Sequence, residues 1–427
     1  MHSHILCARP ADAQALGAAV ETFVRTLRPR RARLYDYYRG AQGVPKGERV
    51  SGRPDHRLCV PFPRYITEVQ TGYFLGRSPT LHFPDEALES RFAALSRALD
   101  LPHRLYDAAR DMSVCGAGYL LVWADRGGLH ACRADPCDCF SLVSPAAGAP
   151  RTGAVRLYAG ETRGETRGVL YTPERILPFL WDGARVRFGA GEENLLRAIP
   201  LLEFSNTCEG AGDFESVTGL VDAYNLLLSG ALDDMQSVAN AFLALYGMQG
   251  TTQGDIDRAN RSRVLSLSAD GRAEFVVKNL NHEALAQLEA NLRRSILQLS
   301  MTPDLADERF AGNTSGVALQ YKLWGIEQIR SAKERSFTVS LRELLGVLTQ
   351  GERLFGGAGD FTAGEATFYK NLPQDEAARA ATLLSLMPLL SRETILAQLP
   401  GVSDPAGELR RKEAEERAQR ETKGDAT

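Results

Sequence analysis

The sequence is poor in cysteine and has no large excess of charge of either sign. Seven cysteines in 427 residues are too few for a disulfide scaffold, and an odd number leaves one unpaired in any full pairing. The net charge of −3 excludes a uniformly basic nucleic-acid coat protein, but it allows a DNA partner bound through local basic patches. With 44% hydrophobic and 24% charged residues, the chain can bury a sizeable core, and its length indicates about two to three domains.

Long hydrophobic segments are also missing. Residues 1–10 contain two histidines and one arginine, without the apolar stretch of a secretory signal, so we expect a reducing, cytoplasmic compartment. An uncharged stretch at 235–254 is interrupted by several Gln, Asn, Ser and Thr residues, which makes it too polar to span a bilayer. We therefore expect no membrane partner.

The common enzyme motifs do not occur. The sequence contains no G-x-x-x-x-G-K-[ST] loop, no H-E-x-x-H pair and no G-x-S-x-G elbow. Residues 115–118 (CGAG) precede a predicted strand, whereas a dinucleotide loop must follow one, so we interpret them as a tight helix–strand junction. His130, Cys132, Cys137 and Cys139 form a metal-like cluster, but their spacing does not fit a structural zinc site. We expect no catalysis, no metal and no cofactor.

Hydrophobic periodicity predicts an α+β protein that is mostly helical. In the first half we expect helices at 11–38, with a break or kink near Pro29, and at 65–75, 84–100 and 104–114. Short apolar runs between glycine-rich turns predict strands at 119–124, 155–159, 169–172, 176–181, 185–188 and 200–204. In the second half we expect helices at 217–246, 282–299 and 315–349, a loop at 301–314, a strand at 366–369 and a helix at 375–390. Residues 408–427 predict a solvated helix or a disordered tail.

Acidic residues are concentrated where basic ones are missing. Residues 198–257 contain nine Asp or Glu and no Lys or Arg, and basic residues follow at Arg258, Arg261 and Arg263. Asp222 and Asp233 are eleven residues apart, close to three helical turns, so they share a helix face. This face is either an ordinary solvated surface or an acidic wall past which DNA moves without adhering.

The loop at 301–316 (MTPDLADERFAGNTSG) is unusual for its length. It places sixteen residues of mixed charge between two predicted helices. Structureless loops this long are uncommon unless they have a function, and a tolerated surface loop is the alternative.

Short motifs along most of the chain occur in a recognisable order. They lie at 34–40 (LYDYYRG), 63–67 (PRYIT), 71–79 (TGYFLGRSP), 113–119 (SVCGAGY), 219–225 (GLVDAYN) with 233–234, 310–322 (FAGNTSGVALQYK), 371–373 and 390–394. Their order, and above all the motif at 310–322, resembles the portal proteins of tailed double-stranded DNA phages. The similarity extends over about residues 34–408.

The resemblance implies a portal fold, in which twelve subunits surround a channel at one vertex of the capsid. It divides this chain into an N-terminal helix (1–33), an α+β wing (34–206), a stem helix (207–247) and a small clip (248–280), then a second stem helix (281–300), a tunnel loop (301–314), a long helix with a wing return strand (315–373), and a helical crown with the C-terminal tail (374–427). The clip and the tail are both short in this sequence.

The same resemblance implies where DNA and partner proteins bind. In the tunnel loop, the residues expected to contact DNA are Asp307, Glu308, Arg309, Phe310 and Asn313. In the stem, the residues expected to line the channel are Asp222, Asp233, Asp234, Arg293 and Arg294. In the clip, the residues expected to contact the terminase are Arg258, Arg261 and Arg263. The implied partners are further copies of the chain, double-stranded DNA, the terminase large subunit, a head–tail connector, and the major capsid and scaffolding proteins. ATP hydrolysis by the terminase would drive DNA movement through a passive channel in the virion of a phage, a prophage or a gene-transfer particle. Another structural head or connector protein is the first alternative, and an enzyme that uses the cysteine region is the second.

Overall fold

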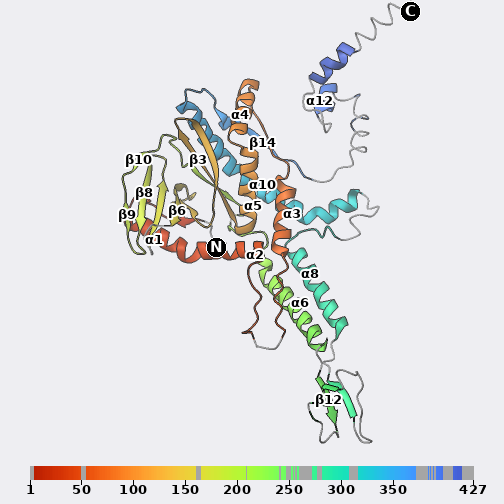
Figure 1. Cartoon of the computed structure of the whole chain (residues 1–427). Coiled ribbons are helices and arrows are strands. Elements are labelled where there is room, and N and C mark those ends of the chain that lie inside the picture. Colours follow the sequence, from red (N-terminus) through yellow and green to blue (C-terminus); the bar gives the residue numbers. More distant parts are fainter. Residues whose placement is uncertain are drawn as a thin grey trace, which may run out of the picture. The chain divides into compact units, whose positions relative to one another are not determined.

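The computed structural model describes most of the chain. The described residues are 4–49, 54–159, 165–207, 209–239, 242–246, 272–276, 281–306, 316–371, 391–397 and 407–415, with isolated positions between 252 and 258 and between 383 and 388. They form two compact units, Met1–Lys370 and Asn371–Thr427 (Figure 1). The predicted class is confirmed, because helices predominate and the strands gather in the first half of the chain.

The N-terminal helix is continuous but changes its winding before Pro29. Helix α1 (Ala13–Thr22) passes through a π-helical segment, Phe23–Leu27, directly into α2 (Arg28–Arg39). Proline lacks the N–H that an α-helix interior needs, and a wider π turn accommodates this loss. Gly40 ends α2 with a φ of 72°, a left-handed conformation that favours glycine.

Two sheets form the α+β part. The larger sheet has the order β1 (Ile5–Leu6), β5 (Cys139–Val143), β6 (Arg151–Ala159), β7 (Thr166–Tyr171), β8 (Arg175–Trp181) and β10 (Glu192–Glu193), and β9 (Val186–Phe188) also pairs with β8. Only β1 and β5 run parallel within it. The smaller antiparallel sheet has the order β11 (Leu201–Ser205), β3 (Ala117–Asp125) and β4 (Gly128–Ala134). Apolar residues of α1 and of the π-helical segment pack on the larger sheet, where Phe23 stacks on Phe140.

Helices cover the smaller sheet. The main core joins α3 (Phe62–Leu75), α4 (Glu86–Ala98), α5 (Leu101–Cys115) and the long helix α10 (Gly316–Leu354) to the strands β3 and β11. Phe337 of α10 lies at the centre of this core, against Phe74 and Phe204. The short strands β2 (Thr80–His82) and β14 (Glu365–Thr367) pair beside it. All four helices were predicted, with ends that differ by a few residues.

A separate pair of helices extends from this body (Figure 1). Helix α6 (Thr218–Ala239) packs against α8 (His282–Leu299), and β12 (Phe242–Tyr246) pairs antiparallel with β13 (Arg272–Val276) beyond them. The prediction of one helix over 217–246 is therefore wrong for its last part. The apolar run FLALY suits a buried helix or a strand equally, and pairing with the distant residues 272–276 decides for the strand.

The second unit contains α12 (Arg392–Ala397) and a helical segment at 407–415 whose side chains are mostly exposed. The tail prediction is confirmed for the part at 408–415, while most of the helix predicted at 375–390 lies outside the described residues. Of the described helices, none combines the length and the apolar composition needed to cross a bilayer.

Candidate functional site

An extended segment lies along one face of α6. We call residues 41–61, between α2 and α3, the arm; its described parts are 41–49 and 54–61. Backbone amides of the arm donate to α6 side chains at alternate residues: His56 to Asp233 at 2.7 Å, Leu58 to Ser229 at 2.9 Å and Val60 to Asn225 at 2.8 Å. One turn before Asn225, Asp222 accepts a hydrogen bond of 2.6 Å from the hydroxyl of Tyr37.

The spacing of these contacts follows from helix and strand geometry. Two residues of extended chain advance about 6.6 Å, and four residues of helix advance about 6 Å. Side chains at positions 225, 229 and 233 of α6 therefore meet every second amide of the arm, as the edge of a sheet would. Ser229 and Asn225 are fully buried beneath the arm, so these polar contacts are shielded from water.

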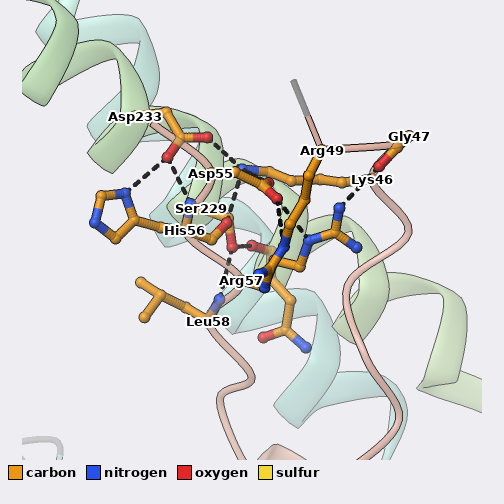
Figure 2. A network of polar contacts seen from close by, with 10 residues as sticks. Lys46, Gly47, Arg49, Asp55, His56, Arg57, Leu58, Ser229 and Asp233 are labelled. Atoms are coloured by element: carbon orange, nitrogen blue, oxygen red, sulfur yellow. Dashed lines mark hydrogen bonds and ion pairs between the residues drawn. The ribbon is translucent and has the colours of Figure 1, made fainter. Parts of the chain in front are cut away.

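Asp233 belongs to a charged cluster around the middle of the arm (Figure 2). Its carboxylate accepts from the His56 amide, contacts His56 Nδ1 at 2.7 Å and pairs with the ammonium of Lys46. The His56 amide, followed by the Lys46 ammonium, lowers the pKa of Asp233 to about 2. Asp55 lies beside Lys46 and pairs with Arg49 at 3.2 Å and with Arg57 at 3.0 Å.

The predicted acidic wall is thus largely paired within the subunit. Asp222 and Asp233 do share a helix face, as predicted, but Asp222 accepts from Tyr37 of α2 and Asp233 holds the arm. Asp234, the next stem candidate, is half-buried and also has an interaction partner. Other acids of residues 198–257 are structural, since Asp213 pairs with Lys333 in the interior and Glu215 pairs with Arg30. The carboxylates of Asp222 and Asp233 on this face of α6 therefore bind other segments of the same subunit.

Replacing Asp233 with alanine is expected to release the arm. The substitution removes the acceptor of the His56 amide and the partner of Lys46, leaving the arm held through Ser229 and Asn225. We expect tryptic cleavage after Lys46 to become about tenfold faster, because proteolysis follows the population of the open form. The matched control is Gln236→Ala, at an exposed position of the same helix. Equal cleavage rates in the two variants would mean that Asp233 does not hold the arm.

The second helix of the pair carries the predicted basic residues. Arg293 of α8 pairs with Asp304 at 2.9 Å, whereas Arg294 is exposed and has no ion-pair partner among the residues that the structure describes. Both arginines line an open groove of about 490 Å³ together with Glu289, Ala290, Leu297, Gln298, Asp304 and Ala306. The groove lies between α8 and the segment that leaves it. This arrangement provides one cation for a negatively charged partner.

Several predicted site residues lie outside the described part of the chain. They are Asp307, Glu308, Arg309, Phe310 and Asn313 of the predicted tunnel loop and Arg261 and Arg263 of the predicted clip. Arg258 is described and exposed. These assignments stay predictions.

The arm residues Lys46 and His56 and their α6 partners Asn225 and Ser229 were missed by the sequence reasoning. A signal existed in part, since positions 222, 225, 229 and 233 are all polar and recur at intervals of three and four, the spacing of one helix face. The arm itself has no periodic pattern that indicates a partner. In the described part of the chain, no three His, Cys, Asp or Glu side chains are arranged to hold a metal ion.

Comparison with known proteins identifies the class. A sequence profile of phage portal proteins matches residues 25–422, nearly the whole chain. The chain belongs to the family described as "Phage portal protein, SPP1 Gp6-like".

Individual relatives are distant. The chain is 22% identical over 223 residues to the portal protein of Bacillus phage SPP1, covering 51% of this chain and 44% of the relative. It is 21% identical over 218 residues to the portal protein of Clostridium phage phiCD119, covering 50% of this chain and 47% of the relative. The chain thus spans about half the length of the curated relatives it matches.

Solved structures with a similar chain include those of gene transfer agent (GTA) particles. One is the neck of an empty GTA particle, at 14% identity and a TM-score of 0.44, covering 79% of this chain and 89% of that chain. Another is the virion of a native GTA particle, at 12% identity and a TM-score of 0.46, covering 87% of this chain and 93% of that chain.

Proposed function

We propose that copies of this chain form a ring that surrounds a channel at one vertex of a capsid. The resemblance to the family implies about twelve copies. Double-stranded DNA passes through this channel during packaging and ejection. Membership of the portal family over residues 25–422 is the observation that carries this proposal. The protein acts as a conduit without catalysis of its own, and the terminase supplies the energy by hydrolysing ATP.

The proposed partners follow from the same role. The terminase large subunit docks during packaging and a head–tail connector docks afterwards, both at the clip that includes Arg258, Arg261 and Arg263. The major capsid and scaffolding proteins contact the ring in the host cytoplasm during assembly, and the finished ring resides in the virion. The two-stranded β12–β13 tip beyond α6 and α8 supports a docking role, since it lies apart from the main cores.

Charge at the stem suits the passage of DNA. Around Asp233 and Asp55, two carboxylates lie with three cations, those of Lys46, Arg49 and Arg57. One positive charge of this cluster is in excess, and a ring repeats it in every subunit, so such a wall attracts phosphates moderately and does not repel them. We propose that Arg294 and the loop residues Asp307, Glu308, Arg309, Phe310 and Asn313 make the transient contacts with DNA, and that Asp222, Asp233 and Asp234 contribute to the stem wall.

Imaging of the purified protein, with its mass measured in solution, tests the ring. We expect closed rings of about twelve subunits with a central hole wide enough for duplex DNA. Closed assemblies without such a hole would favour another head or connector protein. Compact dimers of the 46.7 kDa chain containing stoichiometric metal would favour the enzyme alternative.

A further inference from the structure

The segment at 300–306 is fixed at its beginning by the way in which α8 ends. The Met301 amide donates to the Gln298 carbonyl at 3.1 Å, and the Thr302 amide donates to the Leu297 carbonyl at 2.9 Å. This is the Schellman arrangement, whose left-handed position is usually glycine. Here Met301 occupies it with a φ of 51°, and it packs near Gly325 of α10. A left-handed conformation is strained for Met301 and would not be for glycine. Such strain persists where the surrounding structure imposes the conformation, which indicates that contacts on more than one side hold the segment.

Helix α3 holds the same segment through two side chains. The Tyr65 hydroxyl donates to the Pro303 carbonyl at 2.9 Å and accepts from the Leu305 amide at 2.9 Å. Five residues further along α3, the Gln70 amide donates to the Ser300 carbonyl at 2.8 Å and to the Thr302 hydroxyl at 3.0 Å. Gln70 and Thr302 are almost fully buried, so their contacts are protected from exchange with water.

The last part of the segment is tied back to α8. Asp304 pairs with Arg293 and also accepts a hydrogen bond of 3.1 Å from the Ala306 amide. Residues 300–306 therefore contact α3 or α8 at almost every position. Ala306 directly precedes residue 307, the first of the predicted DNA-contacting positions.

We propose that Tyr65 and Gln70 are positioning residues: from α3 they fix the place at which the chain enters the DNA-contacting loop. Neither side chain needs to touch DNA for this role. The Tyr65 hydroxyl binds the segment at both Pro303 and Leu305, and Gln70 binds the residues that end α8. The inference rests on the proposed channel function, and it assigns the control of loop position to a helix that precedes the loop by more than 200 residues.

The test compares Tyr65→Phe and Gln70→Met with the matched control Tyr73→Phe. Tyr73 lies on the same helix, and its hydroxyl donates to Glu327 at 2.7 Å, away from the 300–306 segment. We expect the Leu305 amide to exchange with deuterium about fivefold faster in Tyr65→Phe and to be unchanged in the control. We also expect Tyr65→Phe rings to form normally, but particles assembled with them to protect less DNA from nuclease. Unchanged exchange at Leu305, or faster exchange with normal DNA protection, would overturn the proposal.

A fourth variant separates this proposal from the proposed function. In it, Asp307, Glu308, Arg309 and Phe310 are all replaced by serine. If this variant protects less DNA and Tyr65→Phe protects a normal amount, the positioning role is overturned and the channel function stands. If the serine variant and Tyr65→Phe both protect a normal amount, the contact of the loop with DNA fails, and the positioning role fails with it.

Discussion

Replacing Lys333 with methionine is expected to destabilise the subunit by about 3–5 kcal/mol. Lys333 of α10 pairs with Asp213, and both side chains are only 3% exposed. Asp213 also accepts from Ser113 and, at 2.7 Å, from Asn206, so it joins α5, the segment after β11 and α10. Without the ammonium, the Asp213 carboxylate stays buried and loses its counter-charge. The resulting loss of stability is far larger than the net stabilisation that the intact pair provides.

Lys370→Met is the matched control for this substitution. Lys370 makes the same kind of ion pair, with Glu327 at 3.0 Å, but it is 53% exposed, so we expect a loss of about 0–1 kcal/mol. The double variant Lys333→Met with Asp213→Asn removes both charges and should recover part of the loss. Urea unfolding at a fixed protein concentration measures all three variants. A midpoint for Lys333→Met equal to that of Lys370→Met would show that the buried pair does not stabilise the fold.

Alanine at Gly118 is expected to prevent folding or to cost more than about 4 kcal/mol. A Cβ on Gly118 would lie 2.1 Å from the Ala108 carbonyl oxygen of α5, and its nearest neighbours are all backbone atoms of Ala108, which cannot move away as a side chain could. Gly116, which separates α5 from β3, is equally restricted: its φ is 88°, and a Cβ would lie 2.0 Å from the Gly210 carbonyl oxygen. Gly116 allows α5 to end directly before β3, and Gly118 allows β3 to lie close against α5.

Gly72→Ala provides the control for Gly118→Ala. Gly72 lies within α3, and a Cβ there would meet nothing within 4 Å. Because alanine favours the helix over glycine, we expect this variant to be as stable as the parent or more stable, by up to about 1 kcal/mol. The yield of folded protein and its circular dichroism on heating distinguish the variants. A well-folded Gly118→Ala with an unchanged melting temperature would contradict the close approach of α5 and β3.

The junction at 115–118 also shows how far sequence reasoning reached. Its position before an apolar run excluded a dinucleotide loop and predicted a tight turn, and the structure confirms that turn. The helix at 282–299 was predicted with its observed ends, because an amphipathic pattern of several turns leaves little freedom. The run FLALY at 242–246 was assigned to the wrong element, since five apolar residues carry too short a pattern to separate a strand from a helix.

The sequence by itself determined the α+β class, the long helices and the family. Hydrophobic periodicity and short motifs depend on residues that are close in the sequence, and the order of the motifs can be followed along the chain. The partners of the charged groups were decided only by the tertiary structure. Asp233 meets Lys46 from 187 residues away, and Asp213 meets Lys333 from 120 residues away. Whether a carboxylate is solvated, repels phosphates or holds another segment depends on which distant groups the fold brings within a few ångströms and how much water remains between them.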